Sequence, residues 1–228
     1  MIASELIKIG SDFLKKNQIK TYQIDSELIL SDLVGRSRED FLINSDMEIN
    51  DTQTKSFEAF ISRRAIKKEP MAYILNKKEF WSIKFKIDKG VLIPRPETEL
   101  IVEKILKYYK NSSPYVLDIG TGSGCIIISL LKELRKSKGV AIDISKKALK
   151  IEKKNSIISN TFKRTKFINA SFMQISNFKF DLIVANPPYI ARHQLKNLAE
   201  DIKYFEPKIA LDGGNDGLDV IRKVIYKS

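Results

Sequence analysis

The apolar positions of the first 75 residues recur at the spacing of α-helices. Ile2, Leu6, Ile9 and Phe13 fall on one helical face, and three further apolar stripes follow. These stripes are bounded by a stop at Gly35, by possible N-caps at Ser37 and at Asn50 or Asp51, and by Pro70. No strand pattern interrupts them, so we predict a helical domain over residues 1–75.

The pattern then changes to a period of two. Apolar and polar residues alternate from Trp81 to Ile87, which predicts a strand over residues 80–87. Asp88-Lys89-Gly90 predicts a turn and residues 91–93 a return strand, so we expect a hairpin linker over residues 76–94. A helix should then run from Glu97 to Tyr109, because acidic residues suit the first turn of a helix.

From Tyr115 onward, near-continuous apolar segments alternate with helical patterns. Strands are predicted over residues 115–119, 139–143, 166–168 and 180–185, and helices over 125–134 and around 148–151. Apolar strands separated by helices indicate a parallel sheet that is buried on both faces. We therefore expect an α/β domain over residues 95–228.

A glycine-rich loop follows the first of these strands and opens a helix. Its sequence, Gly120-Thr121-Gly122-Ser123-Gly124, has Gly-x-Gly-x-Gly spacing, whereas the dinucleotide fingerprint is Gly-x-Gly-x-x-Gly. Asp143, 19 residues past Gly124, ends the next strand and can bind two ribose hydroxyls. Asp118, just before the loop, can oppose a sulfonium charge. The pattern favours S-adenosylmethionine over NAD, with Asp118, Asp143 and all five loop residues as cofactor-binding residues.

A second motif, Asn186-Pro187-Pro188-Tyr189, directly follows the fourth predicted strand. Ligands of open α/β sheets bind at the carboxyl ends of the strands, so we expect this motif beside the glycine loop. The Asn186 side-chain oxygen and the Pro187 carbonyl can each accept one N–H of a planar –NH2 group, and Tyr189 offers an aromatic face. We predict Asn186, Pro187 and Tyr189 as catalytic residues, with Pro188 joining them in substrate binding.

The composition excludes several other classes of site. One cysteine, Cys125, and one histidine, His193, allow no disulfide, no thiolate metal cluster and little prospect of a zinc site or a catalytic triad. No apolar run approaches the ~20 residues that span a bilayer, and the first residues lack a secretory signal pattern. We expect a cytoplasmic, monomeric enzyme without a metal or a membrane partner.

The net charge of +12 admits two interpretations. It is compatible with an anionic partner, and hence with proximity to the ribosome or to nucleic acid. However, 31 of the 40 basic residues are lysine and only 9 are arginine, a mixture that an AT-rich genome would also produce. Base recognition would favour arginine, so the total charge alone does not predict a nucleic-acid substrate.

With both motifs in place, the chain resembles the HemK/PrmC family along nearly its whole length. Residues 92–99, Leu-Ile-Pro-Arg-Pro-Glu-Thr-Glu, are similar to that family's joint between its helical and catalytic domains, and residues 206–218 to its stretch after the catalytic loop. The resemblance implies a class-I S-adenosylmethionine methyltransferase fold of Rossmann-like type. It implies methylation at N5 of the glutamine in the GGQ motif of class-I peptide-chain release factors, with residues 1–75 recognising that substrate. It also implies that Phe172 lies against the adenine and that Asn186 helps bind the cofactor.

The chain departs from the family pattern at its C-terminal end. The family's fold continues past a helix like residues 216–226 into three more strands, whereas this sequence stops at Ser228. We therefore expect the methyltransferase domain to be incomplete at its C-terminus, with the fourth strand as an exposed sheet edge. Two alternative functions follow from the residues: N-methylation of adenine or another base in DNA or RNA, and an inactive truncated remnant.

Overall fold

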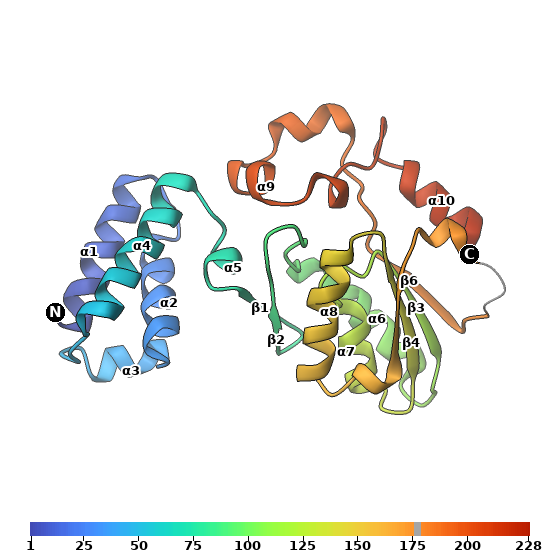
Figure 1. Ribbon diagram of the computed structural model, residues 1–228, viewed down its shortest axis with the longest axis horizontal. Helices are drawn as coiled ribbons and strands as arrows, with labels where there is room; N and C mark the ends of the chain where they lie inside the picture. Colours follow the sequence, from blue (N-terminus) through green and yellow to red (C-terminus); the bar gives the residue numbers. More distant parts are fainter. Residues whose placement is uncertain (176–178) are drawn as a thin grey trace. The chain divides into compact units, whose positions relative to one another are not determined.

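The computed structural model describes residues 1–175 and 179–228, and the chain divides into two compact units, residues 1–75 and 76–228. The first unit is helical (Figure 1). Its helices are α1 (Ala3–Lys16), α2 (Tyr22–Val34), α3 (Arg38–Ile43), α4 (Asp51–Lys67) and the short α5 (Met71–Ile74). Ser37 and Asn50 cap α3 and α4 through capping boxes, as their sequence positions predicted.

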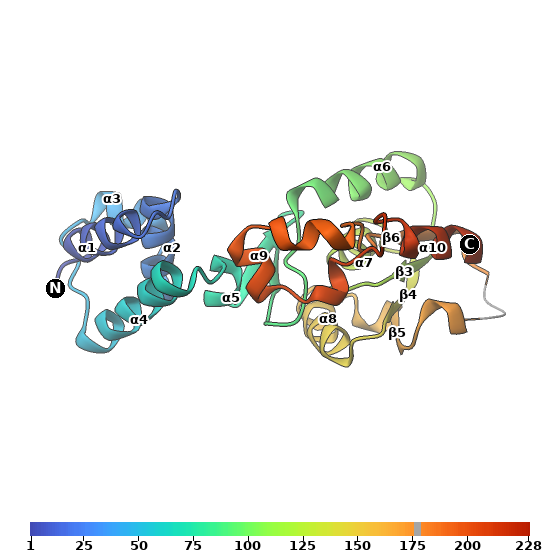
Figure 2. The ribbon, with the colours of Figure 1, turned by 90° about the horizontal axis from the view of Figure 1, so that it is seen from above.

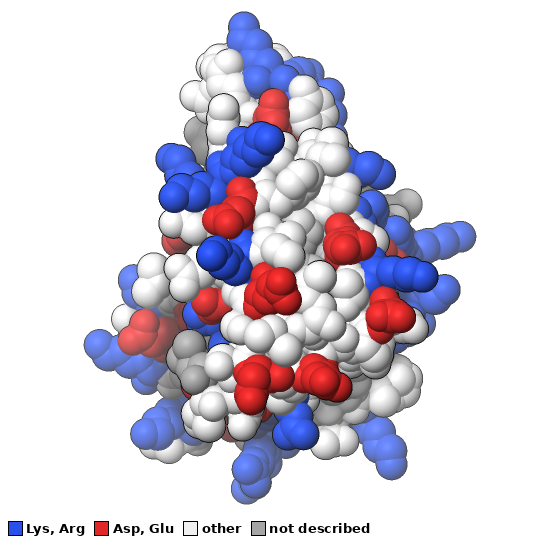
Figure 3. All heavy atoms as spheres, turned by 90° about the vertical axis from the view of Figure 1, so that its left-hand side faces the viewer, with Lys and Arg blue, Asp and Glu red and all other residues white. Residues whose placement is uncertain are grey.

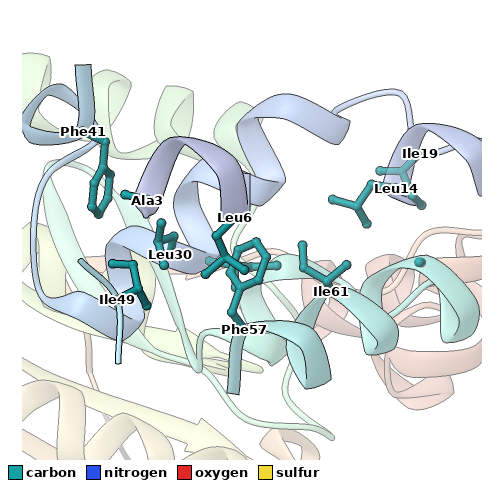
Figure 4. Packing of buried hydrophobic residues seen from close by; sticks show 11 residues of the cluster. Ala3, Leu6, Leu14, Ile19, Leu30, Phe41, Ile49, Phe57 and Ile61 are labelled. Atoms are coloured by element: carbon teal, nitrogen blue, oxygen red, sulfur yellow. The ribbon is translucent and has the colours of Figure 1, made fainter. Parts of the chain in front are cut away.

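A core of its own stabilises this helical unit. Leu6, Leu30 and Phe57, from α1, α2 and α4, are at most 1% exposed and pack together (Figure 4). α1 and α4 approach closely at Gly10, where an added Cβ would lie 2.6 Å from the Phe57 ring. Burying such large side chains contributes roughly 1.5–3 kcal/mol each, so residues 1–75 have the apolar core that an independent unit needs.

The second unit begins with a two-stranded antiparallel hairpin. Its turn lies earlier in the chain than the predicted turn at Asp88-Lys89-Gly90. β1 (Lys77–Phe80) pairs with β2 (Ile83–Lys86), and the turn lies at Trp81 and Ser82. Both turn residues have positive φ, 52° and 54°, which matches the right-handed twist of a two-residue hairpin. The predicted return strand over residues 91–93 was therefore wrong, because the partner of β2 precedes it in the chain.

Four parallel strands form the sheet of the second unit in the order β5-β4-β3-β6. Their bounds are Tyr115–Ile119 for β3, Lys138–Asp143 for β4, Thr165–Asn169 for β5 and Leu182–Ala185 for β6. Figure 2 shows the strands in this order, from β6 at the top to β5 at the bottom. The predicted parallel α/β sheet is confirmed.

Three helices cover one face of this sheet, and α10 (Asp219–Lys227) lies on the other (Figure 1). α6 (Glu99–Tyr109) packs on α7 (Cys125–Glu133), and α7 packs on α8 (Lys146–Ile158), so the three helices form one layer. Ile127 of α7 rests on Gly139 of β4. Leu117 and Val140 point to the other face, where Val224 of α10 joins their cluster.

The chain after β6 winds over the carboxyl ends of the strands without adding a further strand among the described residues. It contains α9 (Glu200–Phe205) and two 3₁₀ turns, η4 (Arg192–Asn197) and η5 (Lys208–Ala210). An isolated bridge joins Ile190 to Asp212. β6 is the edge strand beside β3, as expected, yet Val184 is buried and its neighbours in the strand are half-buried.

Candidate active site

The glycine loop connects β3 to α7 through three left-handed residues. Gly120, Gly122 and Gly124 have φ of 69°, 60° and 81°, a conformation that side chains with a Cβ rarely adopt. The N–H groups of Gly120 and Thr121 donate to the Ile142 carbonyl, at 2.9 and 3.1 Å. These two N–H groups therefore anchor the loop to β4. The glycines are needed because the turn is tight.

Asp143 stands at the carboxyl end of β4 and faces the same loop. Its two carboxylate oxygens accept the N–H groups of Gly122, at 3.0 Å, and Ser145, at 2.8 Å. A carboxylate has about four acceptor positions, so each oxygen keeps capacity for one further donor such as a ribose hydroxyl. The two hydrogen bonds hold the carboxylate in a fixed orientation at the sheet edge.

A pair of buried carboxyl groups lies beneath the loop. The Thr121 hydroxyl donates to Asp118 at 2.9 Å and approaches Glu152 of α8 at 3.2 Å. Burial raises the pKa of Asp118 to about 7, although the Thr121 hydroxyl and the Ile127 N–H lower it. Burial also raises the pKa of Glu152 well above its ordinary value, and the neighbouring Asp118 raises it further. Glu152 belongs to no motif, so its place in the site was not predicted from the sequence.

The glycine loop and the Asn-Pro-Pro segment border one cavity of about 690 Å³, a size typical of small-molecule and cofactor sites. Nine of the predicted site residues line this cavity: Gly120, Thr121, Gly122, Ser123, Asp143, Phe172, Asn186, Pro187 and Pro188. In the described part of the chain, three others do not line it. Asp118 is buried beneath the loop, Gly124 is the last loop residue and packs against Glu152, and Tyr189 is 63% exposed. The roles assigned to these residues stay predictions.

Asn186 is held by a residue of the Pro-Glu-Thr-Glu run at residues 96–99. Its side-chain nitrogen donates to the Thr98 hydroxyl at 3.3 Å, and both residues line the cavity. Thr98 ends the 3₁₀ turn η1 (Pro96–Thr98) and is 6% exposed. The Pro-Glu-Thr-Glu run resembles a domain joint in sequence, and no pattern in it predicted a role for Thr98 in the site.

A second contact ties the same segment to the chain beyond β6. Arg95 forms an ion pair with Glu206, whose side chain is only 1% exposed. Burial raises the pKa of Glu206, while Arg95 acts in the opposite direction. The segment from Arg95 to Thr98 therefore contacts two residues that follow β6 in the chain, Asn186 and Glu206.

Glycines after β6 pack against the end of the Asn186–Tyr189 segment, which we call the acceptor segment. Gly213 donates its N–H to the Ile190 carbonyl at 2.9 Å, and the backbone N–H of Arg192 donates to the Gly214 carbonyl at 2.8 Å. A Cβ at Gly213 would lie 2.8 Å from the Tyr189 Cα, and one at Gly217 would lie 2.5 Å from the Tyr189 carbonyl oxygen. Only glycine allows this close backbone approach.

The lining fits S-adenosylmethionine. Phe172, Ile144 and Met173 provide apolar surface next to Asp143, where an adenosine would lie. The Cys125 thiol also borders the cavity, and burial raises its pKa to about 12, so it stays protonated and suits packing rather than nucleophilic attack. Among the described residues, no three His, Cys, Asp or Glu side chains are grouped to hold a metal. No helix there combines the length and apolar character needed to cross a bilayer.

Comparison with known proteins agrees with this geometry. Residues 5–75 match the PrmC N-terminal domain, and residues 85–204 match the methyltransferase small domain. The hMettl16 catalytic domain, solved in complex with an RNA hairpin, superposes with a TM-score of 0.53 at 16% identity, covering 78% of this chain and 63% of that one. At that identity the likeness shows the fold alone.

Relatives at higher identity share nearly the whole chain. The release factor glutamine methyltransferase of Clostridium acetobutylicum is 38% identical over 231 residues, which cover 100% of this chain and 80% of the relative. Those of Fusobacterium nucleatum and Geobacter sulfurreducens are each 36% identical, covering 93% of this chain and 61% and 74% of the relatives. On this identity, and on the two matched domains, the chain belongs to the HemK/PrmC family of S-adenosylmethionine-dependent methyltransferases.

Proposed function

We propose that this enzyme transfers a methyl group from S-adenosylmethionine to the side-chain amide nitrogen, N5, of the GGQ glutamine in class-I peptide-chain release factors. The observation that carries the proposal is the single cavity bordered by both Asp143 and Asn186. A cofactor seated by the glycine loop would share this cavity with a planar amide seated by Asn186 and Pro187. Relatives named for this activity support the choice of substrate.

Bound S-adenosylmethionine supplies a methyl group made electrophilic by the neighbouring sulfonium. The Asn186 side-chain oxygen and the Pro187 carbonyl accept the two N–H groups of the glutamine amide. These two acceptors draw electron density toward the nitrogen and fix its orientation. Methyl transfer would break the C–S bond of the cofactor and form the C–N bond, and one amide proton would be released to solvent. Alignment of this kind can lower a barrier by roughly 7–11 kcal/mol, so positioning is the main catalytic task of these residues.

The substrate can be tested directly with the purified chain. Incubation with methyl-labelled S-adenosylmethionine is carried out in parallel with a class-I release factor, its GGQ Gln→Ala variant, ribosomal RNA and DNA. Label should appear on the wild-type release factor and be absent from the glutamine variant, with mass spectrometry locating one added methyl group on that glutamine. Label on RNA or DNA instead would overturn the proposal, and intact cofactor binding without any transfer would indicate a remnant that has lost its activity.

Asn186 provides the test at the level of the site. Asn186→Ala removes one acceptor, and kcat should fall on the order of 10²–10³, the loss typical for one polar group that acts on the transition state. Cofactor affinity should remain within a few fold. The control Asn197→Ala changes an exposed asparagine of η4 that does not line the cavity, and its kcat should match the wild type. Equal kcat in both variants would show that Asn186 does not act on the substrate.

The proposal places residues 1–75 as the substrate-recognition unit, residues 76–94 as the linker and residues 95–228 as the methyltransferase domain. It further places the enzyme in the cytoplasm, as a monomer that meets the release factor near the ribosome. The face in Figure 3 carries Asp and Glu side chains among its Lys and Arg, so that face is not uniformly basic. Co-sedimentation with ribosomes at rising salt measures the ribosomal contact, because an electrostatic contact weakens with salt.

A further inference from the structure

The side chain of Asn186 presents two chemically different ends to the cavity. One end of the amide is an oxygen that only accepts hydrogen bonds, and the other is an –NH2 group that only donates. The two ends have nearly the same shape, so a half-turn of the amide exchanges them without a steric penalty. For a glutamine amide nitrogen, whose N–H groups must be accepted, that exchange would set donor against donor.

The structure contains a partner that holds one of the two ends. The Asn186 side-chain nitrogen donates to the hydroxyl of Thr98, which lies 88 residues earlier in the chain, at 3.3 Å in a part-buried position. With the nitrogen held there, the oxygen is the end left for the substrate. Thr98 itself is 6% exposed, so bulk water competes little for its hydroxyl.

Thr98 is in turn held in place by its neighbours. Its N–H donates to the Arg95 carbonyl at 3.0 Å, and the Arg95 side chain is paired with the buried Glu206. On the other side, the Glu99 carboxylate accepts the Trp81 N–H at 2.8 Å. The backbone at Thr98 and the neighbouring Glu99 are therefore held in place, which a residue that orients another side chain requires.

We propose that Thr98 is a positioning residue that keeps the Asn186 amide oxygen directed at the substrate nitrogen. This inference rests on the proposed function, in which Asn186 accepts an N–H of the glutamine amide. Thr98 acts through Asn186 and needs no contact with the substrate. The Pro-Glu-Thr-Glu run thereby has a part in the reaction in addition to joining two segments of the chain.

Two substitutions separate the hydroxyl from the shape of the side chain. Thr98→Val keeps the volume and removes the hydroxyl, whereas Thr98→Ser keeps the hydroxyl and removes a methyl group. We expect kcat of Thr98→Val to fall ten- to a hundredfold and that of Thr98→Ser to stay within threefold of the wild type. KM for the release factor should change less than threefold, because the lost orientation acts mainly on the transition state. If Thr98→Val does not fold, Thr98→Ala removes the same hydroxyl.

Thr165→Val is the matched control. The Thr165 hydroxyl is also buried and donates to the Thr161 carbonyl at 3.1 Å, but Thr165 does not line the cavity. Its kcat should equal that of the wild type once the folded fraction is taken into account. Loss of kcat in Thr165→Val as large as in Thr98→Val, or equal loss in Thr98→Val and Thr98→Ser, would overturn the proposal in favour of a general packing effect.

A second measurement does not depend on the substrate. In ¹⁵N spectra the Asn186 side-chain –NH2 signal, identified by its disappearance in Asn186→Asp, should exchange with water several times faster in Thr98→Val and at the wild-type rate in Thr98→Ser. Unchanged exchange in Thr98→Val would overturn the positioning role. Slowed exchange in the wild type without methylation of the release factor would leave Thr98 holding Asn186 and refute the proposed function instead.

Discussion

At the scale of single residues, Glu152 has the least usual surroundings. Its side chain is fully buried below the glycine loop, where an added Cβ on Gly124 would lie 2.5 Å from the Glu152 Cγ. One carboxyl oxygen is within reach of the Thr121 hydroxyl, and the other has no hydrogen-bond partner in the described part of the chain. Burial raises its pKa well above the ordinary value, so the group is protonated over a wide range of pH.

This burial predicts a pH dependence of stability. Burial raises the pKa of both Asp118 and Glu152, so between the unfolded pKa and the higher folded pKa the native state keeps protons that the unfolded state has lost. Their stabilising contribution is complete below about pH 4 and is lost as the pH rises through the folded pKa. The free energy of unfolding should therefore fall with rising pH, by at most about 1.4 kcal/mol per pH unit for each group.

Glu152→Gln removes one of these groups, so its free energy of unfolding should fall less steeply than that of the wild type. Urea unfolding at several values between pH 5 and pH 8 measures the two slopes. Glu103→Gln, at an exposed position of α6, should keep the wild-type slope. Identical slopes in all three proteins would show that Glu152 does not hold a proton in the folded state.

The sequence predicted the residues that lie next to one another in a motif, and it missed the contacts between distant residues. Gly120, Asp143 and Asn186 follow or end predicted strands, so the strand pattern alone places them at one sheet edge. Glu152 and Thr98 reach the site through contacts with Thr121 and Asn186, 31 and 88 residues away. Tertiary packing creates such contacts, and no local pattern records them.

At the scale of elements, the alternation of apolar and polar residues in the hairpin predicts which side chains are buried. It does not predict where the chain turns. Ile83 and Phe85 are buried as their period of two predicted. The same period continues across Trp81 and Ser82, where the chain reverses, although neither is a residue that favours positive φ. The position of the turn depends on contacts from outside, including the bond from the Trp81 N–H to Glu99.

The glycine segment behind Tyr189 supports a prediction about an element. Gly217→Ala would bring a Cβ within 2.5 Å of the Tyr189 carbonyl oxygen at a φ of +85°, so the acceptor segment must shift. A misplacement of about 1 Å can cost on the order of 10²-fold in rate, so kcat should fall by about that factor. Cofactor affinity, measured by calorimetry, should change little because Gly217 does not line the cavity.

Gly35→Ala separates the strain of a left-handed residue from the close approach. Gly35 caps α2 with a φ of +71°, and a Cβ there would meet nothing within 4 Å. Both variants carry the cost of left-handed backbone, about 1–2 kcal/mol, but only Gly217→Ala should lose kcat. If both lose activity to the same extent per folded molecule, strain alone accounts for the effect and the support of Tyr189 is not needed.

At the scale of the whole molecule, the two units have separate cores. The cluster around Leu6, Leu30 and Phe57 contains residues of the first unit alone, and the cluster around Leu117 and Val140 contains residues of the second alone. Each unit can therefore be destabilised through its own core. This separation allows the proposed division of labour, recognition by residues 1–75 and transfer by residues 95–228, to be tested by one substitution.

Phe57→Ala should remove about 3–5 kcal/mol from the stability of the first unit, because Phe57 is 1% exposed in that core. Residues 76–228 should still bind S-adenosylmethionine with wild-type affinity, while methylation of the release factor should show a raised KM or be lost. Calorimetry and labelling on the same samples measure the two properties, and Glu58→Ala, at the exposed neighbouring position, should change neither. Unchanged methylation by a protein whose first unit has unfolded would refute the recognition role of residues 1–75. Joint loss of cofactor binding and methylation would show instead that the two units unfold together.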